Sequence, residues 1–319
     1  MDFRFTQDQQ DLIDAAKAVF DGENTVERMR RIAAGEAVDS LWPKFAELGL
    51  LGIMAPESAG GLAQPLVVMA GIAEAAGYAG LPEPLIEQAG ITIPAMIEAS
   101  QDVKNIVTGK TKVAVQSNLR PFIHAEQTID FFLCGYDLIP KEEVTLTPVS
   151  SIDPLRQLNK LPACGKQSGW ENGAILTAAK LIGLSCRMLD MSVEYAKDRE
   201  QFGKPIGSFQ AVKHHLANLH TQIEFTRPIV HLAAIKGGMA VHNAKIAAID
   251  TAMLAAETAI QIHGGMGYTF EVDLHLFMKR TWALCGEWGD RNYHMKKLEA
   301  YVLDSQTEFG PDITFMEDF

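Results

Sequence analysis

The sequence predicts a mainly α-helical protein in which a small β domain separates two helical parts. An N-terminal helical domain covers residues 1–108, a reduced middle β domain covers residues 109–168, and a C-terminal helical bundle covers residues 169–319. Two observations predict this order. Apolar residues recur at three- and four-residue spacing in the first and last parts, and short β-branched and aromatic runs, typical of strands, lie between them.

The first domain opens with a helix that has a clear start signal. Thr6 and Gln9 form a capping-box pattern, in which each side chain bonds the other residue's backbone N–H. The apolar residues that follow fall on one helical face: Leu12, Ile13, Ala16, Val19 and Phe20. Proline and glycine predict a loop over residues 52–61. Further helices are expected over residues 40–48, 65–77 and 84–99.

The middle part changes to strand-like composition and the last part returns to helix. Strands are predicted over residues 113–115, 129–134 and 144–149, within a sheet of about four or five strands. Helices are then expected over residues 178–197, 212–230, 244–259, 274–285 and 291–304. The third of these carries a stripe of small residues, mainly alanine, which lets helix backbones approach closely in a bundle or a subunit interface.

Composition and charge exclude several classes of protein. The chain has 28 basic and 40 acidic residues, a formal charge of −12, which argues against general nucleic-acid binding. No stretch reaches the about 18 uninterrupted apolar residues of a membrane span, and no signal peptide is visible. The cysteines are scattered without metal-type spacing, so we expect reduced, mostly buried thiols in a cytoplasmic protein. They are Cys134, Cys164, Cys186 and Cys285.

Three histidines stand close together, but no metal site is expected. His214, His215 and His220 fall on one predicted helix, and no Glu-x-x-His pair of the di-iron type accompanies them. We interpret them as polar-face or interface residues.

Three local motifs resemble those of the acyl-CoA dehydrogenase family. Residues 56–61 (Pro-Glu-Ser-Ala-Gly-Gly) are similar to the family's Pro-Glu-x-x-Gly-Gly loop. Residues 199–206, followed by Gln210, match its Arg-x-x-Phe-Gly-x-x-Ile…Gln signature, and residues 261–267 match Gln-x-x-Gly-Gly-x-Gly. The resemblance covers nearly the whole chain and is most specific from about residue 181 to 268. It implies the same order of helices, small sheet and bundle.

The resemblance also implies a cofactor, FAD, and residues that contact it. In the family, the arginine and phenylalanine of the first signature reach the FAD of a neighbouring subunit, and the later motif lies along its adenosine half. Carried over, the FAD-contacting residues are Arg199, Gln201, Phe202, Gln210, Gln261 and Gly265. An arginine fork suits a pyrophosphate, and glycine lets backbone approach a ligand closely.

The glutamate that the family uses as base is missing from both of its usual positions. That base takes a proton from the carbon next to a thioester, which requires a carboxylate. By alignment, one position falls on Trp288 and the other on Gly173, and neither side chain is a base. Glu287 is the nearest substitute, followed by Asp290 and Glu171. We interpret all three as helix-end charges, because one residue along a helix rotates a side chain by about 100°.

The middle domain lacks the segment with which the family holds the flavin ring and the acyl-CoA. The run at residues 113–118 passes directly into Leu119-Arg120-Pro121, where that segment would be expected.

The favoured hypothesis is therefore a subunit of a heteromeric, FAD-dependent acyl-CoA dehydrogenase. Its full-length partner would supply the glutamate, and the resemblance to short family members in bacteria implies an acyl-CoA substrate such as a steroid-derived one. Two alternatives stay open: a self-sufficient homo-oligomeric dehydrogenase using Glu287, and a flavin-free scaffold subunit.

Overall fold

Helix α1 (Gln7–Glu23) begins at the predicted capping box. Thr6 Oγ1 accepts a hydrogen bond from the Gln9 backbone N–H at 3.3 Å, and Gln9 Oε1 accepts one from the Thr6 N–H at 3.1 Å. Ile13, Ala16 and Phe20 are buried, so the predicted apolar face is confirmed. The structure is a computed structural model and describes residues 4–117, 119–125, 128–162, 164 and 168–304.

The rest of the N-terminal part is helical, as predicted. Its elements are α2 (Val26–Ala33), α3 (Trp42–Glu47), α4 (Leu66–Tyr78), the π-helix η3 (Ile86–Thr92), α5 (Ile93–Glu98), α6 (Lys104–Val107) and two 3-10 turns, Leu50–Gly52 and Glu57–Ala59. The helix expected over residues 84–99 is divided into η3 and α5. Pro94 explains the division, because it has no N–H for the Gly90 carbonyl one α-turn earlier. That carbonyl accepts a hydrogen bond from Asn172 Nδ2 at 2.8 Å.

The middle part contains two small sheets where one was expected. In the first, β1 (Val113–Val115) pairs in parallel with β3 (Phe131–Cys134), which pairs antiparallel with β4 (Asp137–Pro140). In the second, β6 (Leu158–Lys160) pairs antiparallel with β2 (Phe122–His124) and β5 (Thr147–Pro148). These short strands share a core of only six buried residues: Ala114, Ile123, Ala125, Ile129, Phe132 and Leu161.

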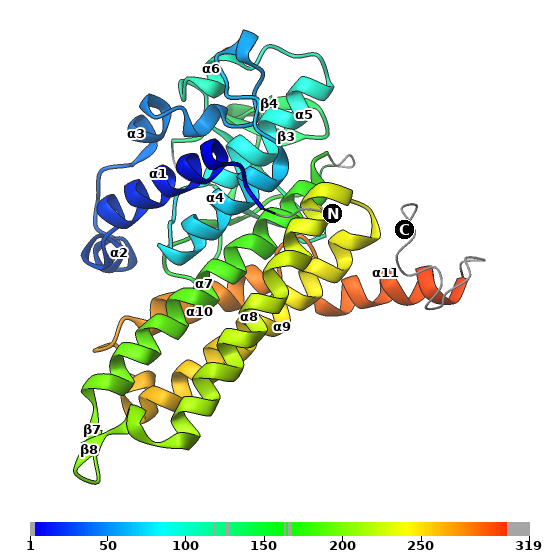
Figure 1. Ribbon diagram of the computed structural model, residues 1–319. Helices are drawn as coiled ribbons and strands as arrows, with labels where there is room; N and C mark the ends of the chain where they lie inside the picture. Colours follow the sequence, from blue (N-terminus) through cyan, green and yellow to red (C-terminus); the bar gives the residue numbers. More distant parts are fainter. Residues whose placement is uncertain (1–3, 118, 126–127, 163, 165–167, 305–319) are drawn as a thin grey trace.

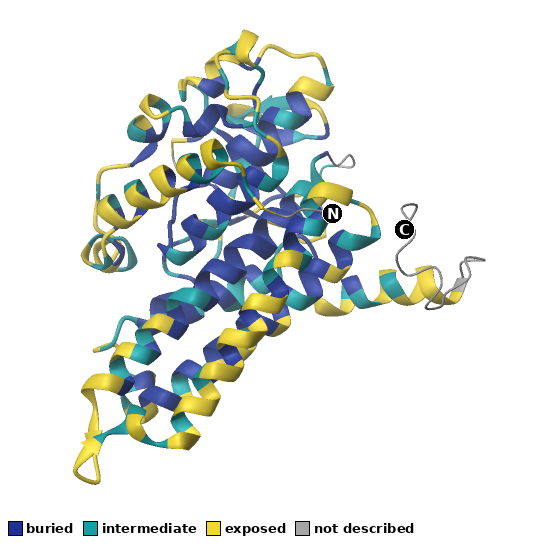
Figure 2. Cartoon of the chain, viewed as in Figure 1, coloured by how far each residue is buried: buried dark blue, intermediate teal, exposed yellow. Residues whose placement is uncertain are grey.

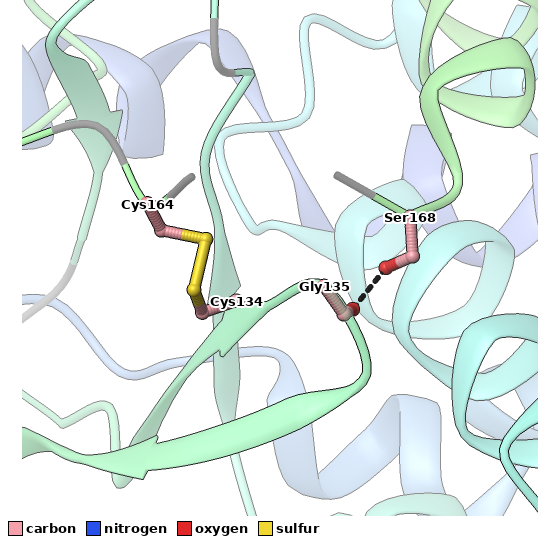
Figure 3. Close-up of a disulfide and its surroundings, with 4 residues drawn as sticks. All are labelled: Cys134, Gly135, Cys164 and Ser168. Atoms are coloured by element: carbon pink, nitrogen blue, oxygen red, sulfur yellow. Dashed lines mark hydrogen bonds between the residues drawn. A yellow bond between two sulfur atoms is a disulfide. The ribbon is translucent and has the colours of Figure 1, made fainter. Parts of the chain in front are cut away.

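A disulfide between Cys134 and Cys164 corrects the expectation that all four cysteines are reduced (Figure 3). It joins the end of β3 to the segment that leads into the bundle. Close by, the Ser168 hydroxyl donates a hydrogen bond to the Gly135 carbonyl. Spacing alone could not predict this pair, because 30 residues separate Cys134 at the end of β3 from Cys164, which follows β6. Cysteine usage therefore gives no support to the predicted cytoplasmic location.

The C-terminal bundle consists of long helices and a small hairpin at its far end (Figure 1). The helices are α7 (Trp170–Asp198), α8 (Gln210–Lys236), α9 (Met239–His263), α10 (Leu274–Cys285) and α11 (Arg291–Asp304). The hairpin is β7 (Glu200–Gln201) and β8 (Lys204–Pro205), and η6 (Gly264–Tyr268) follows α9. The small residues of α9 are largely buried against α7 and α8, as the predicted stripe requires. The fold class predicted from the sequence is confirmed.

Glycines allow α4 of the first part and α7 of the bundle to pack backbone to backbone. A Cβ on Gly77 would lie 2.2 Å from the Lys180 carbonyl oxygen, and one on Gly183 would lie 1.9 Å from that of Glu74. The two helical parts therefore share one continuous apolar core (Figure 2).

A buried arginine joins all three parts of the chain. Arg280 on α10 is 2% exposed, and its Nη1 donates to Asp153 Oδ2 in the middle part at 2.9 Å. Its Nη2 donates to the carbonyl of Leu81, between α4 and η3. This contact fixes α10 against the small sheets, and the loop after α10 carries Glu287 and Trp288.

Candidate functional site

The two positions that the family resemblance assigns to the base lie against each other. Gly173 is in the first turn of α7, and Trp288 is in the loop between α10 and α11. A Cβ on Gly173 would lie 2.4 Å from both Cδ2 and Cε2 of the indole. Trp288 is only 2% exposed, so its ring fills the space next to Gly173. Each of the two residues requires the other: glycine leaves the room that the indole takes.

The loop around Trp288 is held by buried hydrogen bonds. Trp288 has φ +55° and Gly289 has φ +106°, so the chain turns sharply there. His294, fully buried, donates from Nε2 to the Trp288 carbonyl at 3.2 Å, and its Nδ1 lies 2.9 Å from Nδ1 of His242. Burial, assisted by Lys245 and His242, lowers the pKa of His294 to about 3. The ring is therefore neutral, and Nδ1 accepts a hydrogen bond from His242.

The three candidate carboxylates near this site all have structural partners. Glu287 Oε1 accepts from Nη2 of buried Arg156 at 2.9 Å. Asp290 Oδ1 accepts from the Tyr293 N–H at 2.9 Å, in the first turn of α11. Glu171 Oε2 accepts from the Gly238 N–H at 3.4 Å. These contacts agree with the interpretation of helix-end and loop charges.

Arg156 is charged even though it is buried. Burial lowers its pKa, but the charge and hydrogen bond of Glu287 outweigh this, so that the pKa is raised above the ordinary arginine value. The Glu287 carboxylate therefore faces a permanent cation.

A cavity of about 420 Å³ lies between the small sheets and α10, beside Glu287. Its lining from the sheet side includes Ser117, Arg120 and Phe122, and its lining from α10 includes Trp282 and Gly286. The lining thus combines polar and aromatic side chains, and it includes Glu287, the neighbour of Trp288 in the chain.

The FAD-contacting residues implied by the resemblance lie at the opposite end of the bundle. Arg199 ends α7 and is exposed, and no salt bridge to it occurs among the described residues. Phe202, between β7 and β8, is 92% exposed. Most of the hairpin is coloured as exposed in Figure 2. With Gly203, Phe202 forms a two-residue turn in which both φ angles are positive, +56° and +76°. Such a turn favours asparagine or glycine, so an exposed phenylalanine there is unusual.

The second motif lies at this same end, where α9 finishes. Gln261 and Gly265 are exposed, and a Cβ on Gly265 would meet nothing within 4 Å. The ring of His263 stacks on Tyr195 of α7 at 4.4 Å, which joins the two motifs. The geometry thus suits a ligand that approaches from outside the chain.

Gln210 and Gln201 are exposed near the same hairpin and have local partners. Gln210 Nε2 lies 3.2 Å from Nε2 of His214, and Gln201 Nε2 donates to the Glu200 carbonyl at 2.7 Å. His214, His215 and His220 are exposed on α8, on the predicted polar face. Within the described residues, no group of three histidine, cysteine or acidic side chains could hold a metal ion. None of the described helices combines the length and the apolar composition that crossing a membrane requires.

Comparisons with known proteins identify the family. The acyl-CoA dehydrogenase N-terminal domain matches residues 6–102, and the C-terminal domain of the same family matches residues 167–297. Acyl-CoA dehydrogenase IpdE2 of Mycolicibacterium smegmatis is 30% identical over 275 residues, which are 83% of this chain and 88% of that protein. The chain belongs to the acyl-CoA dehydrogenase family. IpdE2 of Mycobacterium tuberculosis is 38% identical over 165 residues, 50% of this chain and 52% of that protein.

Solved structures of family members have the same fold. The ChsE4–ChsE5 complex from Mycobacterium tuberculosis gives a TM-score of 0.82 at 21% identity, covering 96% of this chain and 100% of that chain. A Tcur3481–Tcur3483 steroid acyl-CoA dehydrogenase variant gives 0.81 at 22% identity, covering 93% and 98%. Butyryl-CoA dehydrogenase from Megasphaera elsdenii gives 0.78 at 20% identity, covering 95% and 100%. The likeness in fold therefore extends over nearly the whole chain.

Sequence reasoning missed several basic side chains that are buried in the fold. Lys180 and Lys245 are nearly inaccessible, and burial lowers the pKa of each to about 8. Each is a single lysine in an otherwise apolar helical stretch, and this pattern could have predicted from the sequence that the side chain is buried. Arg156 and His294 carry no comparable signal, because their partners come from distant parts of the sequence.

Proposed function

We propose that this chain is a subunit of a heteromeric, FAD-dependent acyl-CoA dehydrogenase whose base comes from a full-length partner. One observation carries the proposal: the indole of Trp288 packs on Gly173, so both positions where the family places its glutamate are filled by groups without a basic atom. FAD accepts a hydride in such a reaction, while a carboxylate removes the proton next to the thioester. This chain would not supply that carboxylate.

The exposed end of the bundle supports a role for the chain toward the partner's FAD. Arg199 would bind the pyrophosphate, and Phe202, Gln201 and Gln210 would flank it. Gln261 and Gly265 would lie along the adenosine half, where the exposed glycine leaves open space. These groups fit the cofactor because they combine an unpaired guanidinium, amide donors and approachable backbone.

The structural relatives suggest the type of assembly and of substrate. ChsE4–ChsE5 and Tcur3481–Tcur3483 are each named as pairs of chains, and the second is described as a steroid acyl-CoA dehydrogenase. By analogy, we propose a hetero-oligomer with an acyl-CoA dehydrogenase partner and an acyl-CoA substrate with a bulky acyl group, such as a steroid-derived one. No described residue selects that group.

Co-expression with a full-length acyl-CoA dehydrogenase from the same source tests the proposal. We expect a complex whose flavin absorbance falls when Arg199→Ala or Phe202→Ala is introduced, with assembly unchanged by mass. Arg31→Ala is the matched control, because Arg31 is also exposed and pairs only on its own surface with Glu36. Stoichiometric FAD and acyl-CoA oxidation by this chain alone would refute the proposal.

The two alternatives predict different outcomes in the same complex. If Glu287 were the base, Glu287→Gln would lower the rate by about 10²–10⁴. We expect little change in rate, because Glu287 is bound to Arg156. If the chain were a flavin-free scaffold, Arg199→Ala would leave the FAD content unaltered, whereas we expect a clear loss.

A further inference from the structure

The cavity between the small sheets and α10 has the features of a ligand site that belongs to this chain. Its volume of about 420 Å³ falls within the usual range of small-molecule pockets, about 300–1,000 Å³. Its lining from α10 comes from the last turn of that helix and the residues just after it, and it shares no residue with the groups assigned to FAD above.

The walls of the cavity are aromatic and apolar. Phe122 from β2 is 38% exposed and Ile152 is 54% exposed, while Trp282 of α10 is half-buried opposite them. Large apolar side chains left exposed in a concave site favour a flat or ring-containing ligand.

One end of the cavity has polar groups that the protein does not saturate. The hydroxyl of Ser117 is buried and has no hydrogen-bond partner among the described residues, and Ser117 is only 8% exposed. Buried hydroxyls are normally satisfied, so this one is a place for a ligand atom. Arg120 lies against Gly286 at the end of α10, where a Cβ would be 2.6 Å from Nη1.

The charges lining the cavity favour an anion. Arg120 Nη2 is 3.5 Å from Asp290 Oδ2, at the limit of a hydrogen bond, and the other oxygen of Asp290 is used by the Tyr293 N–H. The guanidinium fork therefore has no bidentate partner in Asp290, although it could bind a carboxylate in that way. Glu287, the carboxylate in the lining, is bound to Arg156. Since Arg156 and Glu287 neutralise each other, Arg120 is the cation of the lining that remains for a ligand.

We propose that this cavity binds a ring-containing carboxylic acid. Its carboxylate accepts hydrogen bonds from Arg120 and from the Ser117 hydroxyl, and its ring lies between Phe122 and Trp282. The site goes beyond the proposed contribution to FAD, because it is formed entirely by this chain and needs no partner.

Calorimetric titration of the full 319-residue chain with naphthalene carboxylate, and with the neutral naphthalene carboxamide, tests this assignment. We expect the acid to bind about tenfold more tightly than the amide or better, the usual size of one charge-assisted hydrogen bond. Arg120→Ala and Ser117→Ala should remove that preference, Arg120→Lys should restore part of it, and Phe122→Ala should weaken both ligands. Arg31→Ala, an exposed arginine outside the cavity, should change neither.

Equal affinity for acid and amide, no binding of the acid, or unchanged binding in Arg120→Ala would each overturn the assignment. Circular dichroism of every variant shows whether a lost affinity comes from a lost fold. Tighter binding of flavin mononucleotide than of the acid would also overturn it, and would count against the proposed function as well. By contrast, failure of the acid to bind leaves the proposed function untouched, because that function is measured by the FAD content of the complex.

Discussion

The two ends of helix α7 differ in almost every physical property (Figures 1 and 2). Gly173 near its beginning and Arg199 at its end are 26 positions apart, which at about 1.5 Å per residue is about 39 Å. At the beginning, Gly173 is buried beneath the indole of Trp288. At the end, Arg199 and Phe202 project into solvent. Any ligand that meets the exposed end is therefore far from the position where the family's base is missing.

Each end of α7 lies near a bulky residue with positive φ, Trp288 at the beginning and Phe202 at the end. The two residues differ in what offsets the cost of this backbone conformation. A left-handed conformation costs a non-glycine residue about 1–2 kcal/mol. Trp288 recovers this cost through burial of its ring and the hydrogen bond from His294 to its carbonyl. Phe202, by contrast, is 92% exposed, and its ring contact among the described residues is an edge contact with Phe209, with ring centroids 6.1 Å apart. Folding of this chain alone does not explain Phe202, which points to a contact outside it.

The largest effect is expected from Trp288→Ala at the filled end. Removing a buried tryptophan side chain costs about 3–5 kcal/mol of unfolding free energy. Phe202→Ala, at the exposed end, should change it by less than about 0.5 kcal/mol. Urea denaturation of the two variants measures the contrast.

A double-mutant cycle tests whether the contact between Trp288 and Gly173 contributes to the unfolding free energy. Gly173→Ala should be destabilising in the natural chain, where the added Cβ meets the indole, and much less so in Trp288→Ala, where there is room. Additive effects of the two substitutions would contradict the packing described above.

The segment leading into α7 provides a second test at the filled end. Replacing both cysteines (Cys134→Ser with Cys164→Ser) removes the disulfide, which closes a loop with a sequence separation of 30 residues. For a loop of that size, the loss of the cross-link should lower the unfolding free energy by about 3–4 kcal/mol. The free thiols of Cys186 and Cys285 have pKa values raised by burial to about 12 and 11, so they react slowly. Cys186→Ser is therefore the control. Equal stability of the oxidised and reduced natural chain would contradict a structural role for the bond.

How far the sequence predicts this molecule depends on the distance over which each feature is determined. The capping box of α1 and the bounds of α10 follow from local pattern, and both are confirmed. The split at Pro94 and the short helix α2 were not predicted, because each depends on a few residues in a weakly periodic stretch. Of the second small sheet, only β5 falls within a predicted strand, residues 144–149, while β2 and β6 were missed because each is only three residues long.

In the candidate site, too, some features could be predicted from the sequence and others depend on contacts between distant segments. Alignment predicts that Trp288 and Gly173 occupy the base positions, but it does not predict that the indole lies on the glycine, which requires α7 and the α10–α11 loop to meet. The partners of Glu287 and Trp288, Arg156 and His294, follow only from the fold. The roles of Arg199 and Phe202 toward FAD stay a prediction, because they depend on a second subunit.

The unfolding free energy measured as a function of pH tests the role of His294, which binds the Trp288 carbonyl at the buried end of α7. In the folded chain the pKa of His294 is lowered to about 3, whereas the unfolded residue titrates near its ordinary value of about 6.5. The unfolded state therefore binds the proton first. The contribution of His294 is full above about pH 6.5 and declines by up to about 1.4 kcal/mol per pH unit as the pH falls toward 3. Between pH 6.5 and 5, His294→Gln should show a flatter dependence than the natural chain. An unchanged slope would mean that His294 does not titrate in this way.

The smallest expected effect comes from Phe202→Asn at the exposed end, and its sign is what matters. Asparagine tolerates the left-handed φ of this turn, so we expect the chain alone to become more stable by about 0.5–1 kcal/mol. Phe225→Asn is the matched control, because Phe225 is 70% exposed on α8 with ordinary helical φ, where asparagine is a slightly poorer helix former. The FAD content of the co-expressed complex should fall for Phe202→Asn and stay constant for Phe225→Asn. A loss of stability in Phe202→Asn would mean that the ring serves the fold of this chain, and the difference between the two ends of α7 would then need another cause.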